Sequence, residues 1–301
     1  MVRAEFKRLF HKKSFYVLSI ILILIMVTWI FSVYYAGVEE LKQGLPYEQT
    51  QLRCLEPQNI FRQVLLQVSL SIEIVPFIIM GAIIVYDDLK EKTLLQIAVI
   101  NRNKWKYFMN KYLILMIYNL VILLIYFGIG ISFSFMASYI DTTMWKELFS
   151  PYQLASFVMF WLGISFWGMA AMAVTCLTRS GIGGSCVGLY VLAERIYSST
   201  TAVTFHNPVL MKINELLPWE NFNTLFVYAG NLNDLLSGLT EAEKLIYASG
   251  LTMYQLISYN ETIVPYPYFK GIMQIIGVCV IFMLLITGIY LYGYQRCIRK
   301  L

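Results

Sequence analysis

Three ionisable side chains lie within long apolar runs of the sequence, where a charge is costly and usually serves function. Glu73 lies in one run, and Glu194 and Arg195 are neighbours in another. Counted along a helix from the basic end of each run, Glu73 and Arg195 lie at a similar depth. We expect Glu73 and Arg195 to pair with each other or to line one water-accessible cavity. The alternative is that Glu194 and Arg195 end a short span and extend toward the headgroups.

Sequence motifs for catalysis are absent. The chain has no phosphate-binding G-x-x-x-x-G-K loop and no H-E-x-x-H zinc motif, and its two histidines, His11 and His206, are far apart in the sequence. We therefore expect no catalytic residue, no metal site and no cofactor in this chain. The glycines at 181, 183, 184 and 188 follow no strand, so we interpret Gly184-x-x-x-Gly188 as a close helix contact.

The segment 87–111 is the most informative polar stretch, because it has an apolar centre between basic flanks. Thr93 with Gln96 three residues later forms a capping box, which predicts a short helix from Thr93 to about Ile100. So short an apolar helix is not stable alone in water and must dock. It can pack under its own spans or enter a groove on a cytoplasmic partner, with the basic flanks steering the approach.

The composition that surrounds these residues is that of a polytopic membrane protein. Hydrophobic residues make up 58% of the 301 residues and charged residues 14%, far from the composition of soluble domains. Runs of about 20 apolar residues can cross a bilayer as helices. We predict an all-α fold, a single transmembrane domain over residues 1–301, with six spans at 14–35, 60–86, 112–136, 152–177, 182–198 and 271–294.

Most of the 23 lysine and arginine residues lie at the amino end, in segment 87–111 and at the carboxyl end. The positive-inside rule therefore places both termini and segment 87–111 in the cytoplasm. The net charge of +5 reflects this topology and some attraction to anionic lipid, and it gives no reason to expect nucleic acid. The five cysteines suggest no disulfide framework.

Two further features flank the spans. Residues 2–13 alternate basic and apolar side chains in the pattern of an interfacial helix that leads into the first span as an elbow, or of a basic flank that only sets topology. The long segment 199–270 should form an extracellular helical insertion before the last span. Asn207 with Pro208 predicts one helix start there, and Thr240 with Glu243 predicts another.

Taken as a whole, the chain resembles the membrane subunit of type-2 ATP-binding-cassette (ABC) exporters. The likeness rests on the basic elbow, the stretch from Tyr86 to Tyr112, the six-span layout, and the insertion with Asn214–Trp219 before the last span. The resemblance implies that segment 87–111 carries a coupling helix that seats on a separate ATPase subunit. The matching positions are Asp88, Lys92, Thr93, Leu94, Leu95, Arg102 and Lys111. Lys92 replaces a glycine that is frequent in the family.

The resemblance also implies that two permease chains, identical or different, face each other, with the second and fifth spans near the translocation path. The expected path residues are Glu73, Glu194 and Arg195. ATP and Mg²⁺ would bind the partner subunit, so this chain is not expected to be an enzyme. We expect an exporter permease of a bacterial plasma membrane for an amphipathic or hydrophobic substrate, first an antimicrobial peptide or bacteriocin, then a drug, a lipid or a sodium ion. The alternatives are an intramembrane enzyme with Glu73 or Glu194 as base, or a secondary transporter.

Overall fold

The fold is helical throughout the part of the chain that the structure describes. The computed structural model describes residues 7, 11–47, 50–56, 60, 64–65, 68, 72–90, 104–137, 151–197, 213, 216–219, 221–222 and 268–300. The α-helices there are α2 (Lys13–Lys42), α4 (Ile74–Lys90), α6 (Lys104–Ala137), α8 (Pro151–Thr178), α9 (Gly181–Ile196) and α15 (Tyr268–Lys300), and η2 (Gln51–Leu55) is a 3-10 helix. Within these ranges there is no strand, so the all-α prediction is confirmed.

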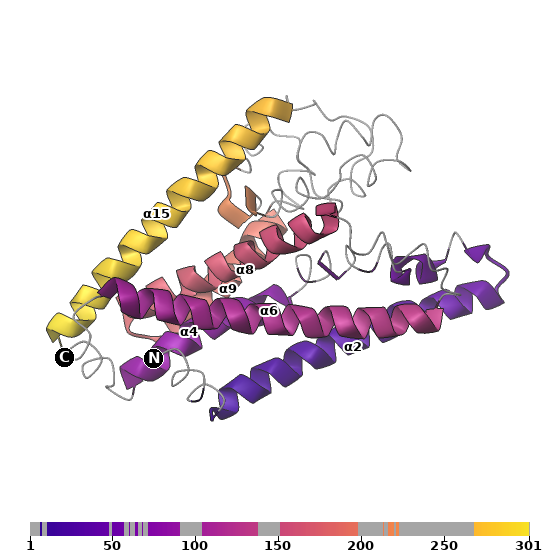
Figure 1. Cartoon of the computed structure of the whole chain (residues 1–301), viewed down its shortest axis with the longest axis horizontal. Helices are drawn as coiled ribbons and strands as arrows, with labels where there is room; N and C mark the ends of the chain where they lie inside the picture. Colours follow the sequence, from indigo (N-terminus) through magenta and orange to yellow (C-terminus); the bar gives the residue numbers. More distant parts are fainter. Residues whose placement is uncertain are drawn as a thin grey trace.

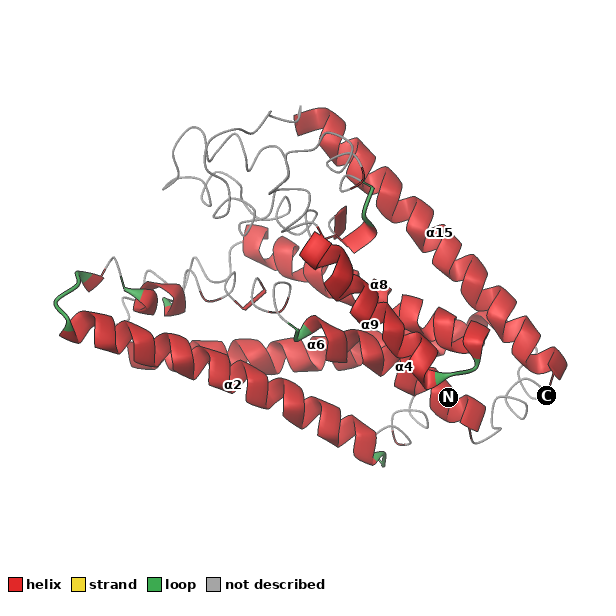
Figure 2. Cartoon of the chain, turned by 180° about the vertical axis from the view of Figure 1, so that it is seen from behind, coloured by secondary structure: helices red, strands yellow, loops and turns green. Residues whose placement is uncertain are grey.

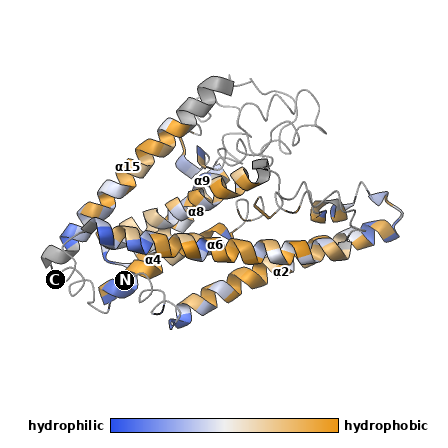
Figure 3. Cartoon of the chain, viewed as in Figure 1, coloured by the Kyte–Doolittle hydropathy of each residue, from blue (hydrophilic) through white to orange (hydrophobic). Residues whose placement is uncertain are grey.

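Four of the helices are long and apolar enough to cross a membrane. They contain the apolar stretches Lys13–Lys42, Trp105–Met136, Leu154–Thr178 and Ile276–Arg296, and Figure 3 shows hydrophobic residues along most of their lengths. Helix α9 is apolar but has 16 residues, and α4 has 17, about 24–26 Å at 1.5 Å per residue. The first, third, fourth and sixth expected spans are thus supported, while a total of six spans remains a prediction.

Helix α4 lies at the centre of the packing. It contacts α8 and α9, while α15 packs against α8 and α2 packs against α6; Figures 1 and 2 show this arrangement from opposite sides. Small residues allow the close approach. A Cβ atom on Gly184 would lie 2.7 Å from the Cβ of Ala82, and one on Gly188 would lie 3.0 Å from Cγ1 of Val75. The expected close helix contact at Gly184 and Gly188 is therefore confirmed, and its partner is α4.

The expected second span, 60–86, is not one continuous helix. Residues 72–73 form a turn, and α4 begins only at Ile74. Pro76 gives the physical reason. Proline has no N–H to donate to the residue four positions earlier and its ring clashes there, but it is tolerated in the first turn of a helix. Helix α4 therefore starts just before Pro76, and the amide of Val75 donates to the carbonyl oxygen of Ile72 at 3.0 Å.

Several helix ends meet at one end of the bundle, which we call the basic end. The start of α2, the end of α4 and the start of α6 are joined there by ion pairs, and the end of α15 contacts the start of α6. The turn between α8 and α9 lies at the same end, since a Cβ on Gly181 would lie 3.0 Å from the ring of Tyr86. That this end faces the cytoplasm remains a prediction from the basic residues.

Three expected elements lie outside the described residues. These are the coupling helix from Thr93 to Ile100, most of the amino-terminal elbow helix at 2–13, and most of the extracellular insertion at 199–270. Of the insertion, the structure describes Ile213, residues 216–219 and residues 221–222, and finds helical backbone at Ile213 and around Trp219. The helices on either side of segment 91–103, α4 and α6, are described, as is α2 after the amino-terminal segment.

Candidate functional site

Two consecutive carboxylates, Asp87 and Asp88, lie in the last turn of α4, three and two residues before the helix ends at Lys90. Successive side chains of an α-helix point about 100° apart around its axis. The two carboxylates therefore face different neighbours. Asp88 faces α6 and Asp87 faces the start of α2.

Asp88 is the centre of a buried group that we call the inner polar cluster: Asp88, Tyr107 and Lys111. Oδ2 of Asp88 lies 2.7 Å from Nζ of Lys111 and accepts a hydrogen bond of 2.6 Å from the Tyr107 hydroxyl. The side chains of Lys111 and Asp88 are 3% and 1% exposed. Tyr107 and Lys111 are four residues apart and so share one face of α6, and the ammonium of Lys111 lies 5.5 Å from the centre of the Tyr107 ring.

Asp87 makes the second ion pair of this helix end. Its Oδ2 is paired with Nζ of Lys12, the residue directly before α2. These side chains are 17% exposed for Lys12 and 22% for Asp87, so solvent reaches this pair. We call it the elbow contact, because it joins the expected elbow to α4.

The last helix is also attached to the inner polar cluster. The ring centres of Tyr107 and Tyr294 are 5.2 Å apart, and those of Phe108 and Tyr290 are 4.5 Å apart. Helix α15 also approaches α8 closely at Gly293, where a Cβ would lie 2.8 Å from the backbone nitrogen of Leu177.

The turn that joins α8 to α9 is attached to the same helix. Nη2 of Arg179 donates to the carbonyl oxygen of Arg296 at 2.9 Å. Arg179 has a φ of 58°, a left-handed conformation that is uncommon for residues other than glycine. Helices α2, α4, α6, α8 and α15 are thus all connected at the basic end.

This arrangement fixes both stems of the predicted coupling segment. The chain leaves the cluster after Asp88 at the end of α4 and returns to it at Tyr107 in α6, so the Asp88–Lys111 pair joins the two helices between which segment 91–103 lies in the sequence. Of the predicted coupling residues, the structure describes Asp88 and Lys111. The others, Lys92, Thr93, Leu94, Leu95 and Arg102, lie outside the described residues.

Sequence reasoning missed Tyr107 and the pairing of Lys12. Part of the signal for Tyr107 was present, because Tyr107 and Lys111 have the spacing of one helix face, but Asp88 lies 19 residues earlier in the sequence. The pairing of Lys12 with Asp87 joins residues 75 positions apart, and no local pattern reveals it.

Glu73 is fully buried in the turn before α4. Its carboxyl interacts with the hydroxyl of Tyr126 in α6, and that hydroxyl donates to the carbonyl oxygen of Leu22 in α2 at 2.8 Å. Glu73 therefore lies where α2, α4 and α6 meet, next to the interruption of the helix.

Glu194 lies in α9 and is 4% exposed. Its Oε1 accepts a hydrogen bond of 2.6 Å from the backbone N–H of Trp219 and so attaches the segment around Trp219 to α9. The Trp219 ring lies 6.3 Å from that of Trp167, and Phe222 stacks on Phe166 at 4.4 Å between ring centres.

The structure shows the contacts of two of the three predicted path residues. Glu73 interacts with Tyr126 in α6, and Glu194 accepts a hydrogen bond from the backbone of Trp219. Arg195 follows Glu194 in α9, and its side chain lies outside the described residues, so its pairing with Glu73 stays a prediction.

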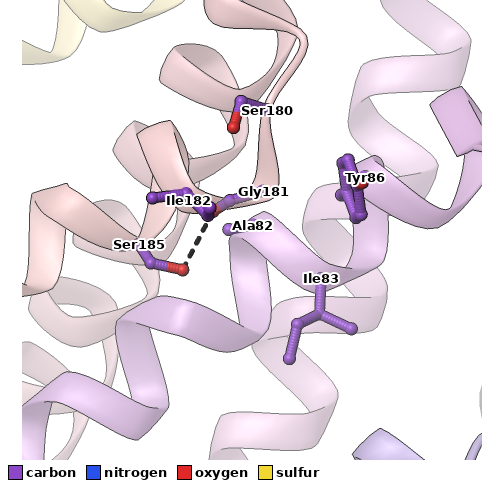
Figure 4. A pocket seen from close by; sticks show the side chains of 7 residues that line it. All are labelled: Ala82, Ile83, Tyr86, Ser180, Gly181, Ile182 and Ser185. Atoms are coloured by element: carbon purple, nitrogen blue, oxygen red, sulfur yellow. Dashed lines mark hydrogen bonds between the residues drawn. The ribbon is translucent and has the colours of Figure 1, made fainter.

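A pocket of about 370 Å³ opens between α4 and the start of α9 near the basic end (Figure 4). Ser180 caps α9 by accepting from the amide of Gly183 at 3.4 Å, and Ser185 donates to the carbonyl oxygen of Gly181 at 2.9 Å. None of the lining side chains is charged. They are Ala82, Ile83, Tyr86, Ser180, Gly181, Ile182 and Ser185.

The site offers no group of three or more histidine, cysteine, aspartate or glutamate side chains that could hold a metal ion, as far as the described residues extend. Its charged groups are held in ion pairs and hydrogen bonds between helices. Such an arrangement can transmit a displacement from one helix to another. These charged groups therefore hold the ends of α2, α4 and α6 in fixed relative positions.

Comparison with known proteins gives one match. A family model described as ABC-2 family transporter protein matches residues 1–192, a range that includes both ion pairs of α4, the pocket and Glu73. No curated protein and no solved structure matches the chain.

Proposed function

The chain belongs to the ABC-2 family of transporter proteins, and from this premise we propose that it is the permease subunit of an ATP-driven exporter. Membership makes the chain a membrane component of transport and implies an ATPase subunit as its partner. The further steps, which concern how the partner is coupled, what is moved and in which direction, are proposed here.

The inner polar cluster is the observation that carries the coupling proposal. A segment that is pushed by a partner subunit can move the spans only if the residues at its two ends are firmly attached to those spans. The Asp88–Lys111 pair, buried and supported by Tyr107, fixes the stems of segment 91–103 to each other and to α15. We assign docking on the ATPase to this segment, with Lys92, Thr93, Leu94, Leu95 and Arg102 at the contact.

In this mechanism closure of the ATPase subunits pushes segment 91–103. The push is transmitted through Asp88 to α4 and through Lys111 to α6, because both residues belong to one buried ion pair. Helices α4 and α6 then tilt together, and a path between two permease chains opens toward the outside. Glu73 lies at the far end of α4, where it contacts Tyr126, so the tilt would also change its surroundings.

The uncharged pocket supports an amphipathic or hydrophobic substrate. Its apolar walls and two hydroxyls suit an apolar group with a few polar atoms, whereas a sodium ion needs several oxygen ligands and a charged partner. Among the substrates expected from the sequence we therefore place an antimicrobial peptide first, and a lipid or an apolar drug after it.

The test is co-purification and reconstitution. The chain is co-expressed with a candidate ATPase subunit, solubilised, and reconstituted into liposomes with and without candidate peptides. We expect the ATPase to accompany the chain and its hydrolysis to rise with the transported substrate. If no ATPase subunit accompanies the chain and hydrolysis does not respond to any candidate, the exporter function is refuted.

A second arm of the test compares two variants. Arg102→Glu reverses a charge inside the proposed docking segment, and Lys42→Glu reverses one in the last turn of α2, away from the basic end. We expect the first variant to lose the ATPase during purification and the second to retain it. Equal retention would move the contact away from segment 91–103.

A further inference from the structure

Lys12 occupies a corner of the chain. Its backbone is extended, with φ −93° and ψ 127°, and α2 begins at the next residue. On the other side of the corner, His11 Nδ1 lies 2.7 Å from the carbonyl oxygen of Lys7, four residues earlier. The direction in which the amino-terminal segment leaves α2 is therefore decided at Lys12.

A lysine is an unfavourable residue at this position. The start of a helix carries a partial positive charge, and anions stabilise it. Helix α2 has no acidic residue in its first turn and no side-chain cap at Lys12. Asp87, provided by α4, supplies the missing negative charge through its ion pair with Lys12.

The elbow contact differs from the neighbouring Asp88–Lys111 pair in its access to water. The side chains of Lys12 and Asp87 are 17% and 22% exposed, against 3% and 1% for Lys111 and Asp88. A buried pair that opens leaves uncompensated charges in a medium that cannot solvate them. When a partly exposed pair opens, both groups are hydrated and screened by salt. Of the two pairs, the elbow contact is thus the one that can open at small cost.

We propose that the elbow contact between Lys12 and Asp87 opens and closes during the transport cycle, while the Asp88–Lys111 pair stays closed, and that it regulates how much substrate moves per ATP hydrolysed. The proposal rests on the proposed function. Asp87 moves with the end of α4, which continues directly into segment 91–103, whereas Lys12 is anchored by the start of α2. Displacement of α4 therefore separates the two charges, and the return of α4 restores the ion pair between Lys12 and Asp87. Lys12 and Asp87 act as positioning residues in this scheme.

The experiment is a charge exchange in the reconstituted complex with the ATPase. Lys12→Glu and Asp87→Lys each place like charges together, and the double variant restores an opposite pair with reversed sign. Lys13→Glu makes the same charge change one residue later, on an exposed side chain, and is the matched control for effects on topology. The quantity measured is the ratio of substrate transported to ATP hydrolysed.

We expect each single exchange to lower this ratio by about threefold, the size of effect that one partly exposed ion pair can exert. The double exchange should return it to near the original value, and Lys13→Glu should leave it unchanged. Rising ionic strength should lower the ratio in the unmodified protein and have little effect on the single variants, whose contact is already lost. A double variant no better than the singles, or singles that equal Lys13→Glu, would overturn the proposal.

Failure of the proposed function gives a different result. If the chain is not an ATP-driven permease, the unmodified protein itself shows no substrate-dependent hydrolysis. If it is, but the elbow contact has no regulatory part, the unmodified protein is active and all four variants retain its ratio.

Discussion

Replacing Asp88 by alanine should destabilise the protein far more than replacing Asp87 by alanine, although the two residues are neighbours in one turn of α4. Asp88→Ala removes the carboxylate that lies 2.7 Å from the ammonium of Lys111, whose side chain is 3% exposed. Asp87→Ala leaves Lys12 with access to water, since its side chain is 17% exposed. Both variants replace an aspartate of an ion pair by alanine, and they differ in how far the partner lysine is exposed to water.

The magnitudes follow from burial. Removing one partner of a buried ion pair costs about 3–5 kcal/mol of the free energy of unfolding, and the Tyr107 hydroxyl also loses the acceptor that it meets at 2.6 Å. An exposed pair contributes about 0–1 kcal/mol. We therefore expect the Asp88 variant to lose at least about 2 kcal/mol more than the Asp87 variant.

The assay is denaturant unfolding of the detergent-solubilised protein, followed by tryptophan fluorescence. A third variant, Asp88→Leu with Lys111→Met, removes both charges and should recover most of the loss, because an apolar pair of similar volume can replace a buried ion pair. Equal losses for the two alanine variants would refute the assignment of the buried pair, and so would a double variant as unstable as Asp88→Ala.

Three other predictions concern separate parts of the molecule. Leu95→Glu should leave the helices inserted but uncouple ATP hydrolysis from transport, which parallel assays of both rates in proteoliposomes would detect; normal coupling would place the contact elsewhere. Gly184→Ala should cost about 1–3 kcal/mol by overpacking, because the new Cβ would overlap Oγ1 of Thr175 and lie 2.7 Å from the Cβ of Ala82, whereas Gly277→Ala meets nothing within 4 Å; a denaturant titration that gives both variants the same stability would contradict this. Glu194→Ala should expose the segment around Trp219 to protease by removing the acceptor of its N–H, whereas Glu194→Gln keeps an acceptor and should stay protected, so equal cleavage of both would argue against that attachment.

Hydrophobic run length was enough to predict much of the fold. Apolar stretches long enough to span a bilayer contain α2, α6, α8 and α15, and composition alone predicted an all-helical chain. The glycine spacing at 184 and 188 predicted a close helix contact correctly but could not identify α4 as its partner. The length of the apolar run predicted the wrong start for the second span, because hydropathy takes no account of the missing N–H of Pro76. Proline is tolerated in the first turn of a helix and not in its interior, so α4 begins at Ile74.

The candidate site was less accessible from sequence. Asp88 was singled out through a family resemblance, yet its partner Tyr107 was not, because the pair forms only when α4 and α6 pack side by side. Glu194 was expected in the translocation path because ionisable groups in spans are usually functional. Its bond to the backbone of Trp219 gives it an attachment role as well, which depends on the fold of a segment 25 residues later.

In the proposed mechanism the turn at residues 72–73 makes α4 a lever. Helix α4 has 17 residues, about 25 Å at 1.5 Å per residue, and the turn before Pro76 interrupts the expected second span ahead of it. A displacement of about 4 Å at Lys90 then corresponds to a rotation of about 9° around that turn. Glu73 sits at the pivot, buried against Tyr126. A residue at the pivot changes orientation with little change of position. The rotation that displaces Lys90 at the end of α4 would therefore reorient the carboxylate of Glu73 without moving it far.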